Sequence, residues 1–339
     1  MFQIIRIRST GFVAGLALLL AAAVAPQARA AEPLKIGYSD WPGFVAWQVA
    51  IDKGWLKEAG VNVEFQWFDY SASLDAYGAG KLDGDLVTNG DALVIGSGGA
   101  KSIMIMLTDY SSGNDMIVGK PGITSLADLK GKKVGIEIGL VEHLLLLNGL
   151  KKAGIPEDAV TLVNTKTNDT PQVLASGAVD AIGAWQPNSG MAMQQLPGSK
   201  PVYTSADEPG LIYDVLAVNP TSLNAHRDDW MKLIKLWNRV VHYINDPKTQ
   251  ADAVKIMAAR VGLTPEQYAP LLKGTHLIDL AEGKSTYKKG DGFSSLYGSS
   301  KIANEFNVKA GVYKQPEDID AYIDPSLTNA QETPMNTAQ

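Results

Sequence analysis

The sequence contains no cysteine among its 339 residues. It therefore offers no disulfide framework, no thiol nucleophile and no cysteine that could carry a lipid near the N-terminus. Basic residues are outnumbered, because 30 Lys and Arg stand against 36 Asp and Glu. Since nucleic-acid binding needs a basic face, this balance excludes nucleic acid as an expected partner. The four histidines show no i,i+4 pair, so we expect no metal site and no other cofactor.

Motifs of the common enzyme classes are also missing. The stretch GSGGAKS at 96–102 superficially resembles a phosphate-binding loop, but Ala100 precedes Lys101 and no glycine has the required earlier spacing. No G-x-S-x-G elbow of a serine hydrolase occurs. We therefore predict that the protein is not an enzyme.

The first thirty residues have the features of an export signal. Arg6 and Arg8 precede the fifteen-residue apolar run GFVAGLALLLAAAVA, and ARA at 28–30 offers small residues for cleavage. A membrane anchor is the alternative, but the run is shorter than the roughly 20 residues that a spanning helix needs. We predict a signal peptide over 1–30 and a soluble monomer in the periplasm of a Gram-negative bacterium.

The rest of the chain predicts a two-domain α/β protein. Its formal net charge is −9, because the −6 of the whole sequence includes Arg6, Arg8 and Arg29 without any acid in the first thirty residues. Short apolar runs such as LKIGYS alternate with amphipathic stretches such as GFVAWQVAIDKGWLKEAG (43–60), as in βαβ units around mostly parallel sheets. From about Thr221 onward helical spacing dominates, and the polar segment 326–339 predicts a flexible tail.

Acidic and aromatic residues gather at the predicted strand ends, where open α/β sheets bind their ligands. Asp40, Asp69, Asp91 and Asp109 follow strands in the first part of the chain, whereas no lysine follows a strand in this manner. The second part repeats the pattern. The predicted ligand-binding residues are Asp40, Trp41, Asn89, Asp91, Asp109, Tyr110, Glu137, Glu142, Trp185 and Asp214.

Each candidate also has a purely structural interpretation. Asp69 and Asp91 could be helix N-caps, Asp40 could cap a turn at Pro42-Gly43, and Glu142 could complement a helix dipole. Other residues are weighed in the same way. Trp47 and Trp55 are expected in the core, Trp67 could be packing in a strand, and His143 could be either a surface residue or a ligand contact.

Three long stretches carry a resemblance to a known family. They are LKIGYSDWPGFVAWQVAIDKGWLKEAGVNVEF, GDALVIGSGGAKSIMIMLTDYSSGNDMIV, and SLADLKGKKVGIEIG followed by HLLLLNGLKKAGI. They resemble the substrate-binding proteins of bacterial ABC importers of the nitrate, sulfonate, taurine and thiamine-precursor class (NMT1/THI5-like). The resemblance implies the two-lobed fold of periplasmic binding proteins, with lobe I at 31–117 plus 215–325 and lobe II at 118–214. It also implies crossings between the lobes near 114–120 and 213–219, and an inner-membrane ABC permease as the partner.

Within that class, the stretches GYSDWPGFVAW and TDYSSGNDMIV resemble those of binding proteins whose transporters are encoded beside urea-carboxylase-like enzymes. Some of those enzymes act on guanidine. A carboxylate-lined cleft would repel an anion, whereas a planar cation would find hydrogen bonds and aromatic faces. We therefore expect a receptor for a small cationic or planar nitrogen compound, with guanidine as the best candidate. The alternatives are a receptor for an anion (sulfonate, taurine, nitrate) or a neutral thiamine-precursor pyrimidine, and a secreted enzyme on the same fold that would use His143.

Overall fold

The computed structural model describes residue 3 and residues 32–332. The predicted signal peptide lies outside the described residues, apart from residue 3. Residues 33–332 form one compact unit. None of the helices in the described part combines the length and the apolar character that crossing a membrane requires.

The first sheet brings together strands from both ends of the chain. Strand β1 is paired in parallel with β2 and β3, whereas β10 lies antiparallel between β3 and β4, and β11 is antiparallel to β4 at the edge. The strands are β1 (Leu34–Tyr38), β2 (Val63–Trp67), β3 (Gly84–Thr88), β4 (Ile103–Ser111), β10 (Tyr213–Val218) and β11 (Thr275–Leu277).

The second sheet is formed by the middle of the chain. In the spatial order β7-β6-β8-β5-β9, β6 is parallel to β7 and β8, and β5 is antiparallel to β8 and β9. The strands are β5 (Asp115–Gly119), β6 (Lys133–Ile136), β7 (Thr161–Asn164), β8 (Ala181–Trp185) and β9 (Lys200–Thr204).

The chain passes between the two sheets twice, and the two crossings lie side by side. It leaves the first sheet at Ser111 and enters the second at Asp115, then leaves at Thr204 and returns at Tyr213. The Ser111 and Ser205 hydroxyls are hydrogen bonded at 2.6 Å across the crossings. All of β5 belongs to the second sheet and all of β10 to the first, so both switches precede the predicted boundaries by a few residues.

The helix predicted over 43–60 is three short helices in the structure. These are α1 (Pro42–Val45), α2 (Trp47–Asp52) and α3 (Trp55–Glu58). The last break is at Gly54, whose φ of 70° is a left-handed conformation that interrupts a helix. Trp47 and Trp55 are buried, so the expectation that they belong to the core is confirmed.

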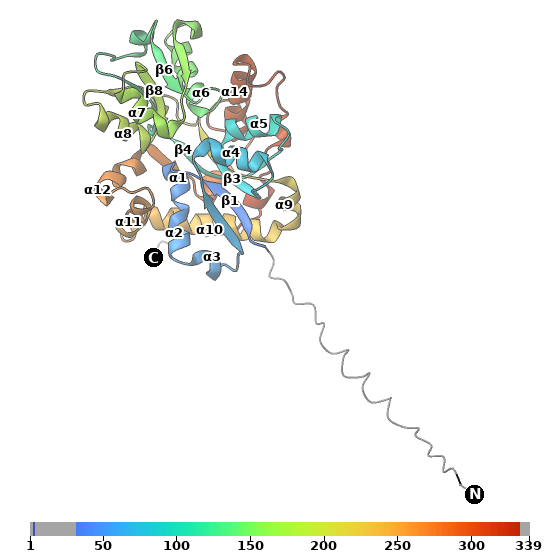
Figure 1. The fold of residues 1–339 in the computed structure, drawn as a ribbon. Coiled ribbons are helices and arrows are strands. Elements are labelled where there is room, and N and C mark those ends of the chain that lie inside the picture. Colours follow the sequence, from blue (N-terminus) through green and yellow to red (C-terminus); the bar gives the residue numbers. More distant parts are fainter. Residues whose placement is uncertain (1–2, 4–31, 333–339) are drawn as a thin grey trace. The chain divides into compact units, whose positions relative to one another are not determined.

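The other helices surround the sheets, as Figure 1 shows, with α6, α7 and α8 beside the second sheet and α2 and α10 near the first. Helix α10 packs against α2 beside the first sheet. Its Trp237 contacts Trp47 of α2, with ring centroids 5.2 Å apart. The helices are α4 (Tyr70–Gly78), α5 (Asn89–Ser97), α6 (Val141–Lys152), α7 (Thr170–Ala175), α8 (Asn188–Gln195), α9 (Pro220–Ala225), α10 (Arg227–Asn245), α11 (Gln250–Arg260), α12 (Pro265–Tyr268), α13 (Leu280–Thr286), α14 (Leu296–Lys309) and α15 (Ser326–Asn329).

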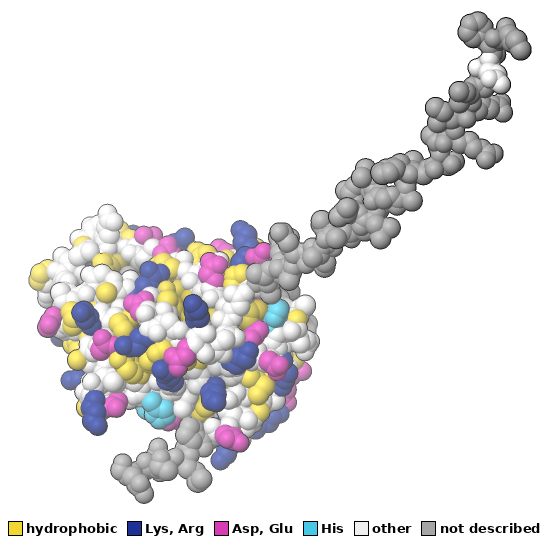
Figure 2. Space-filling model, turned by 90° about the horizontal axis from the view of Figure 1, so that it is seen from below, with side chains coloured by type: hydrophobic (Ala, Val, Ile, Leu, Met, Phe, Trp, Pro, Cys, Tyr) yellow, Lys and Arg dark blue, Asp and Glu magenta, His cyan; other side chains and the backbone are white. Residues whose placement is uncertain are grey.

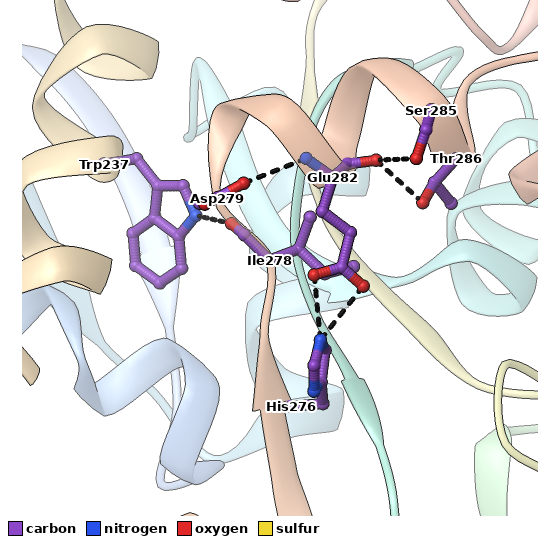
Figure 3. A network of polar contacts seen from close by, with 7 residues as sticks. All are labelled: Trp237, His276, Ile278, Asp279, Glu282, Ser285 and Thr286. Atoms are coloured by element: carbon purple, nitrogen blue, oxygen red, sulfur yellow. Dashed lines mark hydrogen bonds and ion pairs between the residues drawn. The ribbon is translucent and has the colours of Figure 1, made fainter. Parts of the chain in front are cut away.

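Two C-terminal features differ from the sequence-based expectation. The segment predicted to be a flexible tail from residue 326 begins as α15, where Leu327 is fully buried and the Thr328 hydroxyl donates to Ile105 O at 2.9 Å. The segment after Thr221 is not wholly helical, because β11 adds a strand to the first sheet. Figure 3 shows how β11 is held: Trp237 Nε1 donates to Ile278 O at 2.9 Å, and His276 pairs with Glu282 at 2.8 Å.

The surface in Figure 2 carries both signs of charge. Lys and Arg side chains are interspersed with Asp and Glu, and hydrophobic side chains lie between them in small groups. The face shown has no extended basic patch of the kind that nucleic-acid binding requires.

Candidate functional site

The segment after β1 positions the first site residues. Trp41 is the N-cap of α1 and Pro42 its first residue, so Asp40 does not cap the helix and Pro42-Gly43 does not form a separate turn. The Trp41 Nε1 donates to Asp109 Oδ1 at 2.8 Å. Gly43 allows this approach, because a Cβ there would lie 2.0 Å from Asp109 Oδ2. The Trp41–Asp109 hydrogen bond therefore joins the segment after β1 to the end of β4.

A cavity of about 240 Å³ lies between the two lobes, and we call it the inner cavity. It combines two carboxylates, three aromatic rings with polar atoms and a rim of apolar side chains. Three of its residues come from β5, α6 and β8 of lobe II, and most of the others come from lobe I. Its lining residues are Trp41, Phe44, Tyr70, Thr88, Asp115, Val141, Trp185, Ile212 and Asp214.

Two pairs of buried carboxyl groups stand at this cavity. Asp109 and Asp214 are register partners on the antiparallel strands β4 and β10, and their carboxyl groups are within hydrogen-bond reach of each other. Asp115 and Glu142 form a second such pair. Asp115 Oδ2 and both Glu142 carboxyl oxygens are buried and accept no hydrogen bond from the described residues. Two ionised carboxylates this close in a buried site repel each other, so each pair favours a shared proton or a bound cation.

The protonation behaviour of these acids follows from their burial. Removal from water raises the pKa of Asp115 to about 6 and that of Asp91 to about 7. Burial also raises the pKa of Glu142 and Asp214 well above their usual range, and the neighbouring carboxyl groups raise it further. Among the residues that the structure describes, none of the ion pairs involves one of these four acids. No lysine or arginine lines the inner cavity.

The polar atoms of the aromatic lining are already directed at carboxylates. Trp41 donates to Asp109, as described above, and the Tyr70 hydroxyl donates to Asp91 Oδ2 at 2.8 Å. The Trp185 Nε1 donates to Asp40 Oδ1 at 2.9 Å. The N–H groups of Trp41 and Trp185 and the hydroxyl of Tyr70 are therefore already engaged and are not free donors at the cavity.

A second cavity, the outer cavity, adjoins the first and measures about 330 Å³. Tyr70 and Trp185 line both cavities, with their rings edge to face and their centroids 5.2 Å apart. Asp40 and Glu137 lie at the outer cavity together with Asp69 and Trp67, for which the sequence left the location open. Trp67 is one of the exposed large hydrophobic residues.

A third cavity of about 240 Å³ lies behind the first and contains Asn89 and Asp91. The N-cap of α5 is Thr88, whose hydroxyl accepts from Asp91 N, so the N-cap interpretation of Asp91 is wrong. The Asn89 amide donates to Ser299 and Ser300 at 3.1 and 3.0 Å. Asn89 thus ties α5 to α14.

The structure brings five of the ten predicted residues to the inner cavity or to the carboxyl pairs beside it. Trp41, Trp185 and Asp214 line it, and Asp109 and Glu142 are the buried partners of lining groups. Tyr110 stands apart, since its ring stacks on His276 with centroids 4.5 Å apart. His143 is also elsewhere: it accepts from Gly139 N and meets Phe306 edge on.

Sequence reasoning missed Asp115 and Tyr70 as lining residues. Asp115 is the first residue of β5, directly after the first crossing, and an acid at a crossing is the signal that could have identified it. In the described part of the chain, no group of three or more His, Asp and Glu residues could hold a metal ion.

Comparison with known proteins places this geometry in a family. A model of the NMT1/THI5 like family matches residues 41–251. A binding protein of Brucella abortus is 31% identical over 196 residues, which are 57% of this chain and 60% of that protein. The chain therefore matches less than two thirds of the length of that relative. The arginine-binding extracellular protein ArtP of Bacillus subtilis is 32% identical over 108 residues, 31% of this chain and 40% of that protein.

Solved structures share the fold. The alkanesulfonate-binding protein SsuA of Xanthomonas axonopodis pv. citri, bound to MOPS, has a TM-score of 0.71 at 16% identity, covering 88% of this chain and 100% of that one. The periplasmic nitrate-binding protein NrtA of Synechocystis PCC 6803 has a TM-score of 0.70 at 12% identity, covering 88% and 87%.

An enzyme shares the fold as well. The desulfurization enzyme DSZB has a TM-score of 0.60 at 16% identity, covering 88% of this chain and 98% of that one. The structural likeness thus establishes the α/β fold of periplasmic binding proteins, with two lobes on two mixed sheets. Because the family model extends over more than half of the sequence and includes both crossings between the lobes, the chain belongs to the NMT1/THI5-like family.

Proposed function

We propose that this protein is the solute-binding receptor of an ABC importer and captures a small planar cation, with guanidine as the best candidate. The two lobes enclose the solute and present it to an inner-membrane permease. The observation that carries the proposal is the inner cavity, where two pairs of buried carboxyl groups meet without a basic side chain in the lining.

We infer the charge of the solute from the free-energy cost of burying these carboxyl groups in their ionised form. Burying an ionised carboxylate without a partner is expensive, so the pairs must hold protons or a cation. An anion in the same place would face Asp115 and Asp214 directly. It would also find the donors of Trp41, Tyr70 and Trp185 already bonded to carboxylates. A cation replaces the protons and gains charge-assisted hydrogen bonds.

The shape of the solute follows from the lining. The inner cavity is small, as a solute of a few heavy atoms requires. The rings of Trp41, Tyr70 and Trp185 favour a flat cation over their faces, and Asp115 and Asp214 favour donors in one plane. Guanidinium has both properties, because its N–H groups are coplanar and its faces are weakly hydrated.

The named relatives support two different ligand classes. The proteins that bind an alkanesulfonate and nitrate favour the alternative, a receptor for a small anion. The arginine-binding relative recognises a ligand that carries a guanidinium group and favours the cation. The lining chemistry decides our choice, because those likenesses to anion-binding proteins are at 16% and 12% identity and extend to the fold alone.

Isothermal titration calorimetry of residues 31–339 tests the proposal with matched solutes. Urea is planar and nearly the size of guanidinium but uncharged, taurine and sodium nitrate represent the anion alternative, and sodium chloride controls for ionic strength. We expect saturable binding of guanidinium chloride and no measurable binding of the others at the same concentration. Binding of taurine or nitrate without binding of guanidinium would overturn the proposal in favour of an anion receptor.

A further inference from the structure

We infer that Asp40 is an inter-lobe latch: its carboxylate bonds Trp185 and Asn188 of the other lobe and holds Trp185 as the wall between the outer and inner cavities. This inference rests on the proposed function, since the latch sets how fast a captured solute leaves. It makes Asp40 a positioning residue and not a ligand contact.

The geometry of the latch is bidentate across the lobes. Asp40 follows β1 in lobe I, whereas Trp185 ends β8 and Asn188 begins α8 in lobe II. Asp40 Oδ1 accepts from Trp185 Nε1 at 2.9 Å, and Asp40 Oδ2 accepts from Asn188 Nδ2 at 2.7 Å. Both carboxylate oxygens are therefore engaged by donors of the opposite lobe.

The position of Trp185 explains why this contact matters for release. Its ring lines both cavities and meets Tyr70 of lobe I edge to face. Asp40 itself lies at the outer cavity and does not line the inner one. If the two hydrogen bonds break, the Trp185 ring is free to move away from Tyr70. This movement would open a connection between the two cavities.

A role confined to lobe I does not account for Asp40. The N-cap of α1 is Trp41, and Asp40 makes no capping hydrogen bond to that helix. If Asp40 supported only its own turn, replacing it would destabilise lobe I regardless of the residue at position 188. The latch instead predicts that the effect of replacing Asp40 depends on whether Asn188 is present.

The chain's lack of cysteine makes the latch directly measurable. Lys81→Cys in lobe I and Lys130→Cys in lobe II are exposed sites that take spin labels without background. We expect Asp40→Asn to lengthen the distance between the labels in the unliganded protein, and to speed guanidinium dissociation about tenfold with little change in the association rate. Asn188→Ala should do the same, and the double variant should be no worse than either single one.

Asp75→Asn is the control, because Asp75 is an exposed carboxylate of α4 in lobe I that lines neither cavity. It should leave the distance and the rates unchanged. Unchanged distances and rates in Asp40→Asn, or additive effects with Asn188→Ala, would overturn the latch. The label distances are measured without solute, so they test the latch even if guanidinium does not bind the wild-type protein.

Discussion

Asp109 and Asp214 face each other on neighbouring strands, although 105 positions separate them in the sequence. Their carboxyl groups are both fully buried or nearly so, and they contact each other beneath the inner cavity. A sheet that pairs two acids at its centre loses stability by doing so, because burial disfavours the ionised form of each. The same arrangement provides a strong attraction for a cation once one enters.

Replacing Asp115 by asparagine should separate stability from binding. The amide keeps the size of the side chain but has no charge to bury, so the unliganded variant should be more stable at pH 8 by about 1–3 kcal/mol. Guanidinium binding should weaken at least tenfold because a charge-assisted hydrogen bond is lost. Chemical denaturation and calorimetry measure the two effects.

Asp75→Asn is the control for that variant, since Asp75 is an exposed acid of α4. It should change the free energy of unfolding by no more than about 0.5 kcal/mol and leave binding intact. Loss of both stability and binding in Asp115→Asn would instead make Asp115 a structural residue.

The stability of the unliganded protein should fall as pH rises from about 4 to 7. Burial raises the pKa of Asp91 to about 7 and of Asp115 to about 6 in the folded state, whereas both titrate near 4 when unfolded. The folded state therefore binds more protons across this window, and linkage then requires stability to decrease with pH. Unfolding by urea at a series of pH values tests the sign. A rise in stability over the same window would contradict it.

The affinity for guanidinium should change in the opposite direction. Protons compete with the cation for the carboxylates, so binding should strengthen as pH rises through about 6 to 7. Guanidinium itself stays charged throughout this range, as arginine does. Calorimetry near pH 6.5 in buffers of different ionisation enthalpy should show release of protons on binding. A binding enthalpy independent of the buffer would show that no proton is exchanged.

Gly43→Ala should lower both stability and guanidinium binding by displacing the Asp109 carboxylate. The added Cβ would lie 2.0 Å from an oxygen of Asp109, so the carboxylate must move away from Trp41. We expect a loss of about 1–3 kcal/mol in the free energy of unfolding, together with weaker guanidinium binding. Gly78→Ala is the matched control, because a Cβ at this helical position meets nothing within 4 Å. It should be neutral or stabilising by up to about 1 kcal/mol.

The sequence predicted those parts of the fold that depend on local patterns. Strand β1 lies in the apolar run LKIGYS, and the long helix α10 lies in the part after Thr221 where helical spacing dominates. The break at Gly54 was missed, since apolar residues continue on both sides of it and only the left-handed backbone interrupts the helix. Strand β11 was missed because three residues at a sheet edge carry almost no periodicity.

The acidic character of the site was also predictable, since acids at strand ends are visible in the sequence. The pairing of those acids was not, because it depends on the register between β4 and β10 and on the approach of α6 to β5. The same limit applies to Asp40. Its neighbours Trp41 and Pro42 suggested a ligand contact or a cap, and only the approach of the opposite lobe reveals the bonds to Trp185 and Asn188.

A crystal structure of the protein grown with equal concentrations of guanidinium chloride and taurine tests the central claim most directly. We predict guanidinium in the inner cavity, with nitrogen atoms about 3 Å from carboxylate oxygens of Asp115 and Asp214 and its face against Trp41 or Trp185. A taurine sulfonate in that cavity would contradict the account.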